Sequence, residues 1–284
     1  MIKLVLTGSI LLLVFALGLR ARLSDATSLL RELFRPPHRL LRAIVAMFLV
    51  VPLVAVLAAK LVDLSLPVRT AIVAMAVAPI PPILPGKQLR FGGDSSYVFG
   101  LLVAISLVAI VVVPLSVQVM AVIFDRRADF GVVDVGKLIG VTILVPLVAG
   151  IAVRSWAGAA AERLASWAAR LGTVLLVSGL VPVLIAAWPA MASMIRDGGV
   201  VAIGLVVAAA LAAGHALGGP APEERTNLAI ASSMRHPGVA AAIASLGVPE
   251  EPRAQAAILL YLLVAAIATS VYGIARKRQS AIAR

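Results

Sequence analysis

The sequence predicts an all-α, polytopic membrane protein of about nine transmembrane helices, with inverted repeats and two broken crossover helices. Composition is the first reason, because the 284-residue chain is 62% hydrophobic and only 13% charged, with a mean hydropathy of +1.07. A soluble domain of this length could not cover so much apolar surface. The second reason is that apolar runs long enough to span a bilayer recur along the whole chain. The third is that two of these runs are interrupted at corresponding positions in the two halves.

A helix that crosses the hydrocarbon core of a bilayer needs about 20 mostly apolar residues. The connections between such runs are short and carry proline, glycine and charge, so the chain is expected to form a single transmembrane domain over 1–284. The predicted spans are 4–19, 41–59, 68–86, 97–124, 138–153, 170–190, 199–217, 225–246 and 254–273.

The first span could instead be a secretory signal peptide, because Lys3 precedes an apolar run that continues to Leu19. The segment from Leu17 to Arg22 lacks the small-x-small pattern of a cleavage site, which favours a retained first helix.

Positive charge predicts the orientation. The net charge of +12 could suggest a nucleic-acid partner, but the basic residues lie between the apolar spans and not in one cluster. With the N-terminus outside, Lys and Arg on the inside outnumber those on the outside by about two to one, as the positive-inside rule requires. We therefore expect a multi-pass inner-membrane protein with a cytoplasmic C-terminus, in contact with the lipid bilayer and not with nucleic acid.

Several classes of chemistry lack support. The chain has no cysteine, which excludes disulfides, thiol catalysis and thiolate metal sites. The three histidines, His38, His215 and His236, do not have metal-ligand spacing. HExxH, Walker and GxSxG motifs are also missing, so we expect no enzyme, no catalytic residue, no metal site and no cofactor.

The third span contains the first interruption. Between Val77 and Gly86 the chain places prolines at four of seven positions, Pro79, Pro81, Pro82 and Pro85. Each proline inside a helix removes a backbone donor and clashes with the preceding turn, so this segment cannot remain a regular helix.

The eighth span contains the second interruption, at Arg235, His236, Pro237 and Gly238. An arginine at this depth must face protein or water. The two interrupted spans occupy the middle positions of two apolar triplets whose order predicts an inverted repeat. Matched breaks in inverted repeats are typical of the binding site of a secondary transporter. The alternative is that the prolines only kink packed helices, which is common in membranes.

Four stretches resemble known sequence. Leu11 to Leu19, the Arg35-Pro36-Pro37-His38 loop and Arg42 to Pro52 resemble the opening of the bile acid:sodium symporter family, and Arg225 to Ala244 looks like its second crossover helix. The chain resembles a divergent bacterial-type member. The resemblance implies a core domain of spans within 41–124 and 199–273, a panel domain of spans within 4–19 and 138–190, and two discontinuous helices that cross in the core.

The sodium ligands of that family do not carry over. Its crossover glutamate corresponds to Ala231, and the glutamine and asparagine that follow correspond to Arg235 and His236. The glutamine of its second span corresponds to Met47, and its serine–asparagine break falls near Leu84–Gly86. Na⁺ is possible by resemblance, but a hard cation prefers several oxygen ligands including a carboxylate, and neither crossover offers an acid.

Arg235 therefore has two compatible interpretations. It could recognise a substrate carboxylate through a forked pair of hydrogen bonds, or it could tie together carbonyls of the broken helices. His236 could titrate near neutrality and allow proton coupling, or it could stay neutral and bond a freed carbonyl. Ser232 and Ser233 could bind substrate or bond back to their helix, and Asn227 could face the cavity or cap its helix.

Two further predictions are structural. Asp94, with Ser95 and Ser96, is expected to cap the fourth span, and His215 is expected to be a packing or interface residue.

The leading functional prediction is a secondary transporter of a small organic anion, bile-acid-like or another carboxylate, that works by alternating access. It could be sodium-independent or proton-coupled. The alternative is a non-transporting membrane scaffold or sensor that retains the fold; a lipid-acting enzyme lacks a catalytic dyad.

Overall fold

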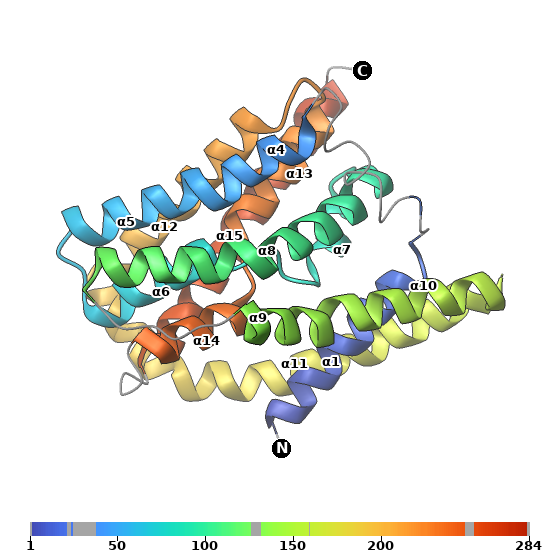
Figure 1. Cartoon of the computed structure of the whole chain (residues 1–284), viewed down its shortest axis with the longest axis horizontal. Coiled ribbons are helices and arrows are strands. Elements are labelled where there is room, and N and C mark those ends of the chain that lie inside the picture. The colour runs from blue at the N-terminus through green and yellow to red at the C-terminus, as the bar shows by residue number, and fades with distance from the viewer. Residues whose placement is uncertain are drawn as a thin grey trace.

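The computed structural model describes residues 2–21, 24, 38–125, 132–158, 160–247 and 253–282. Within these ranges the regular structure is entirely helical (Figure 1). In the described part of the chain, six helices are long and apolar enough to cross a membrane, and two shorter apolar helices accompany them. The predicted fold class is thus confirmed, and the chain is a multi-pass membrane protein.

Each predicted span has its helix or helix pair. The unbroken spans are α1 (Ile2–Gly18), α4 (Arg39–Ile44) with η1 (Val45–Val50) and α5 (Val51–Leu61), α8 (Ser95–Ile123), α9 (Val132–Ile139) with η2 (Gly140–Leu144) and α10 (Val145–Ala157), α11 (Ala160–Arg196), α12 (Gly199–Leu217) and α15 (Arg253–Ile282). The broken spans are α6 (Leu66–Val77) with α7 (Leu84–Arg90), and α13 (Pro222–Ser233) with α14 (Pro237–Gly247). The loop residues Arg35, Pro36 and Pro37 lie outside the described residues.

Two spans contain a π-helical segment that the sequence analysis did not predict. Both segments, η1 and η2, stand directly before a Val-Pro pair, Val51-Pro52 and Val145-Pro146. A proline inside a helix cannot donate to the carbonyl four residues before it and clashes with that turn. The wider π turn accommodates this missing bond, and it leaves backbone carbonyls available to other partners.

Helix α11 is longer than its predicted span and carries two exposed tryptophans. It is 37 residues long, and the sequence criterion found only its apolar part, 170–190. Trp167 and Trp188 on this helix are 70% and 55% exposed. Their separation corresponds to about 31 Å of helix, close to the ~30 Å thickness of the hydrocarbon core. Because tryptophan prefers membrane–water interfaces, we expect these two side chains to lie near the two membrane surfaces.

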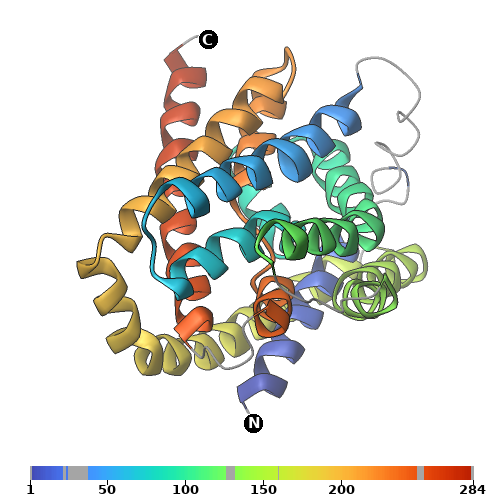
Figure 2. The ribbon, with the colours of Figure 1, turned by 60° about the vertical axis from the view of Figure 1, so that its left-hand side comes forward.

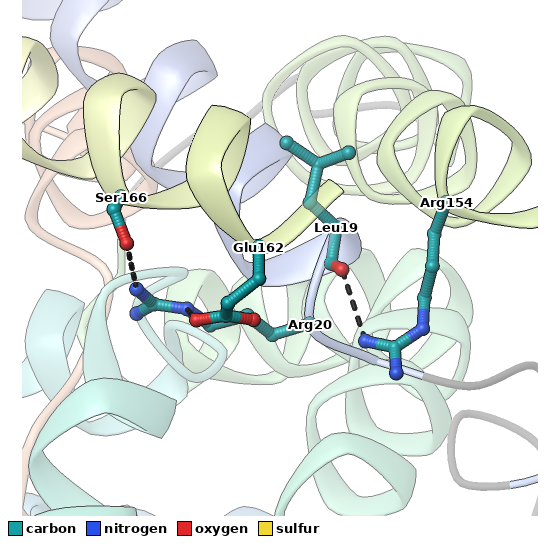
Figure 3. A network of polar contacts seen from close by, with 5 residues as sticks. All are labelled: Leu19, Arg20, Arg154, Glu162 and Ser166. Carbon is teal, nitrogen blue, oxygen red and sulfur yellow. Dashed lines mark hydrogen bonds and ion pairs between the residues drawn. The ribbon is translucent and has the colours of Figure 1, made fainter. Parts of the chain in front are cut away.

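One group of helices consists of α1, α10 and α11, which lie side by side in both views (Figures 1 and 2). At one end of α1, Arg20 pairs with Glu162 of α11 at 3.1 Å and also donates to Ser166 (Figure 3). Arg154 of α10 donates to the carbonyl of Leu19 at 3.0 Å. These contacts hold the three helix ends together.

Glycines allow the closest approach in this group. A Cβ at Gly18 of α1 would lie 2.3 Å from the carbonyl oxygen of Leu147 in α10. A Cβ at Gly150 of α10 would lie 2.4 Å from the carbonyl oxygen of Phe15. Real Cβ atoms cannot approach backbone so closely, so the contact between α1 and α10 requires glycine on both sides.

The remaining helices surround the two breaks. Helix α6 contacts α5, α14 and α15, while α12 contacts α13 and α15. The largest buried apolar cluster runs through these helices. The boundaries between panel and core remain predictions.

Candidate functional site

The first break lies between α6 and α7. Residues 78–83 leave the helical conformation, and they contain Pro79, Pro81 and Pro82. Pro85 is different, because it stands in the first turn of α7, where the missing amide donor costs no hydrogen bond. The expectation that the break falls near Leu84–Gly86 is therefore wrong, since these residues begin α7.

The second break lies between α13 and α14 and is shorter. Met234, Arg235 and His236 are non-helical, and Pro237 is the first residue of α14. Pro237 and Gly238 therefore start a helix and do not form the break itself. Proline is favoured at this position because its fixed φ suits the helix and its missing N–H is not needed.

The two breaks are joined by direct hydrogen bonds. The backbone N–H of His236 donates to the carbonyl of Pro79 at 2.8 Å. The Arg235 guanidinium donates through Nη1 to the carbonyl of Ala78 at 3.1 Å. Segments about 157 residues apart in the chain thus meet at one crossing, as the inverted repeat predicts.

Arg235 is at the centre of this crossing. Its side chain is fully buried, and its Nε donates to the carbonyl of Ser232 at 3.0 Å. Its Nη2 donates to the carbonyl of Met47 in η1 at 2.7 Å. Together with Ala78, these acceptors come from the C-terminal ends of α6 and α13 and from a third span. C-terminal helix ends carry partial negative charge, so their carbonyls suit a cation.

The Met47 carbonyl is available because of the π turn. The N–H of Val51 bonds to Ala46, five residues before it. The next residue, Pro52, has no N–H to offer to Met47 in the same register. The guanidinium supplies the donor that the backbone lacks. Pro52 is the signal in the sequence that could have revealed this contact.

His236 acts as the N-cap of α14. Its Nδ1 accepts from the backbone N–H groups of Gly238 at 3.2 Å and Val239 at 3.4 Å. An accepting Nδ1 places the proton of the neutral ring on Nε2. The expectation that the neutral ring bonds a freed carbonyl is wrong, because its Nδ1 caps α14. The backbone N–H of His236, and not the ring, bonds the freed carbonyl of Pro79. Within the described residues, Nε2 is buried and has no hydrogen-bond partner.

The other predicted site residues are also buried. Ser233 bonds back to the carbonyls of Ala229 and Ile230, whereas the Ser232 hydroxyl has no partner in the described part of the chain. Asn227 lies in the second turn of α13, so it does not cap this helix, whose N-cap is Ala221.

Gln88 and Gly93 are two functional candidates that the sequence analysis missed. Gln88 of α7 donates to the carbonyl of Asn227 at 3.0 Å and links the two crossover helices a second time. A Cβ at Gly93 would lie 2.9 Å from both amide atoms of the Asn227 side chain. Neither Gln88 nor Gly93 lies in a recognisable motif, so the sequence gives no signal that they contact Asn227.

Two more missed residues belong to α7 and α15. Lys87 donates to the carbonyl of Ala266 at 3.0 Å and to the hydroxyl of Thr269. Tyr261 of α15 is fully buried. Its hydroxyl has no hydrogen-bond partner among the residues that the structure describes.

The two structural predictions are consistent with the geometry. Asp94 precedes α8, and its Oδ1 accepts from the N–H of Tyr97 at 2.9 Å, so the predicted cap is present. His215 of α12 contacts Tyr272 of α15, with 2.6 Å between Nδ1 and the phenol oxygen.

The broken, crossed helices can be compared with known families. The family model for sodium bile acid symporters matches residues 8–211. The chain belongs to the sodium bile acid symporter family. Members of this family are membrane transporters, which implies a bilayer and a small-molecule substrate. None of the curated proteins compared with the chain matches it. The second crossover of this symporter-family chain, with Arg235, lies beyond the matched range.

Proposed function

We propose that the chain is a sodium-independent secondary transporter of a small organic anion that works by alternating access. The position of the Arg235 guanidinium carries this proposal. It donates to carbonyls of α6, α13 and η1 at distances of 2.7–3.1 Å. A cation is already built into the place where the ends of both crossover helices meet.

The charge of Arg235 is solvated but not neutralised. Its three partners are neutral carbonyls, and no acidic side chain pairs with it among the described residues. Glu224 lies in the first turn of α13, about 13 Å of helix away from Ser233, where this helix ends before Arg235. A net positive charge therefore remains in the centre of the membrane, where it favours an anion.

The same charge disfavours sodium. A sodium ion about 4 Å from the guanidinium would be repelled by about 4 kcal/mol at an effective dielectric constant of 20. The crossing also lacks the carboxylate that a hard cation prefers. By resemblance, four residues correspond to sodium ligands of the family, and two of them, Ala231 and Met47, have apolar side chains. The other two are Arg235 and His236.

Donors around the crossing suit an anion. Besides the guanidinium, the Nε2–H of His236 and the hydroxyls of Ser232 and Tyr261 are buried without partners in the described structure. These groups would offer hydrogen bonds to a carboxylate in a conformation that opens the crossing. Direct substrate contact by Arg235, His236, Ser232, Ser233 and Asn227 remains a prediction.

Uptake into proteoliposomes tests the proposal. Labelled cholate and a set of smaller carboxylates would be presented with a sodium gradient, with potassium replacing sodium, and with a pH gradient. We expect uptake that is unchanged when potassium replaces sodium. Sodium-driven uptake by the natural chain would contradict the proposal. Failure of every anion to cross would favour the alternative, a scaffold or sensor that retains the fold.

A further inference from the structure

A second candidate site lies away from the crossing. A cleft of about 430 Å³ separates the later half of α11 from the first turns of α15. Its α11 wall includes Pro182, Ala186 and Ala190, and its α15 wall includes Arg253 and Leu259. No residue of either helix break lines it.

The cleft follows from the composition of α11. The residues that face α15 are mostly alanines, including Ala186, Ala187 and Ala190, whose side chains are too small to fill the space. Pro182 and Pro189 lie inside the helix, and interior prolines are a common cause of helix bending. Both walls are candidate membrane spans, so the occupant of the cleft must be compatible with hydrocarbon.

Polarity is distributed unequally along the cleft. Its two polar residues, Arg253 and Gln255, both belong to the first turn of α15. Arg253 donates to the hydroxyl of Ser193 of α11 at 2.8 Å. The N-terminal end of α15 adds partial positive charge there. Leu259 lies about 9 Å further along the helix. The arginine of the lining is therefore at one end of the cleft, and the lining residues that follow Gln255 on α15 are apolar.

We propose that this cleft binds an anionic membrane lipid, with the phosphate at Arg253 and one acyl chain between α11 and α15. The lining has the polarity of a lipid, charged at the membrane surface and apolar at depth. Pro182 and Ala186 are exposed, so the cleft opens sideways to the bilayer and a chain can enter laterally. The guanidinium of arginine matches a phosphate group better than lysine does.

Such a lipid would have a regulatory role. Helix α11 belongs to the predicted panel and α15 to the predicted core, so the lipid touches both parts at once. A ligand that contacts two moving parts shifts their equilibrium by its difference in affinity for the two arrangements. Binding itself does not depend on whether the chain transports an anion.

Native mass spectrometry of the full chain released from nanodiscs tests the site. The discs would contain equal amounts of phosphatidylglycerol and phosphatidylcholine. We expect the natural chain to retain phosphatidylglycerol preferentially, and Arg253→Gln to reduce this preference about fivefold. Ala186→Trp should fill the cleft and lower retention of both lipids.

Matched variants separate the cleft from the general surface. Arg196→Gln removes an exposed charge near the same end of α11, and Val174→Trp adds a ring to an exposed position outside the cleft. Both should retain lipid as the natural chain does. Equal retention by Arg253→Gln and Arg196→Gln would overturn the proposal. Dodecanoate could also displace the lipid from the natural chain while Arg253→Gln and Ala186→Trp retain lipid normally. That result would identify a soluble amphiphile as the occupant of the cleft and would also overturn the proposal.

Discussion

Among the described residues, the hydrogen-bond partners of Arg235 are all backbone carbonyls. Three of its five N–H donors reach carbonyls on three separate elements, and the side chain has no exposed surface. Hydrogen bonds from a charged group contribute about 1.5–3 kcal/mol each, which offsets the cost of removing the charge from water. The residue is therefore both a structural tie and a source of positive charge.

Replacing Arg235 should test its role as a structural tie between the broken helices. We expect Arg235→Ala to lower stability by at least about 3 kcal/mol, because three buried carbonyls lose their donor. Arg235→Lys should keep the charge and restore part of the stability, since an ammonium cannot span three acceptors in a plane. Thermal unfolding in detergent measures this, with the exposed Arg196→Ala as control. Equal stability of Arg235→Ala and the control would contradict the structural role.

Gly93 allows a second test at a single residue. An added Cβ would meet Val98 at 2.8 Å and the Asn227 amide at 2.9 Å. We expect Gly93→Ala to cost about 1–3 kcal/mol through overpacking.

Gly86 provides the control for that substitution. It lies in helix α7 with no atom within 4 Å of its Cβ position, so Gly86→Ala should stabilise the chain by about 0.5–1 kcal/mol. Similar unfolding temperatures for the two variants would show that the contact at Asn227 is loose.

At the scale of elements, prolines decide where helices start and stop. Pro79, Pro81 and Pro82 end one helix, whereas Pro85 and Pro237 begin the next ones. The same residue type therefore forms the breaks and defines the half-helices beside them. The result is two pairs of helix ends facing one another within the membrane, which regular spans could not provide.

The cap of α14 yields a prediction about coupling. His236 caps this helix through an accepting Nδ1, so it must be unprotonated to do so. We expect His236→Asn, which retains a capping oxygen, to keep uptake and its pH dependence. His236→Ala should destabilise the chain by about 0.5–2 kcal/mol. Loss of pH dependence in His236→Asn would instead identify this histidine as the proton carrier.

For the whole molecule, orientation is the open prediction. The natural chain has no cysteine, so single cysteines can report which surface each end of a helix reaches. We expect Asp63→Cys to react with an impermeant maleimide from outside the cell and Ser155→Cys only in inverted vesicles. Both positions are exposed. Labelling of Ser155→Cys from outside would reverse the predicted topology.

Much of the fold was predictable because membrane spans depend on local composition. Nine runs and two breaks follow from apolar length and from proline chemistry, both of which are properties of adjacent residues. The π turns were missed because a proline within a span predicts a missing backbone hydrogen bond but does not show whether the turn before it widens. The extra length of α11 was missed because its first turns are alanine-rich and not strongly apolar.

The membrane class, the spans, the two breaks and the presence of a charge at the second break all follow from the amino-acid sequence. The contacts of that charge depend on how the helices pack. The contact between Arg235 and Met47 joins residues 188 positions apart. The contact forms because helix packing brings the Met47 carbonyl, which Pro52 leaves without a backbone donor, to the broken span of α13 and α14. The cleft between α11 and α15 likewise arises from packing, because small side chains create a cavity only when a second helix closes over them.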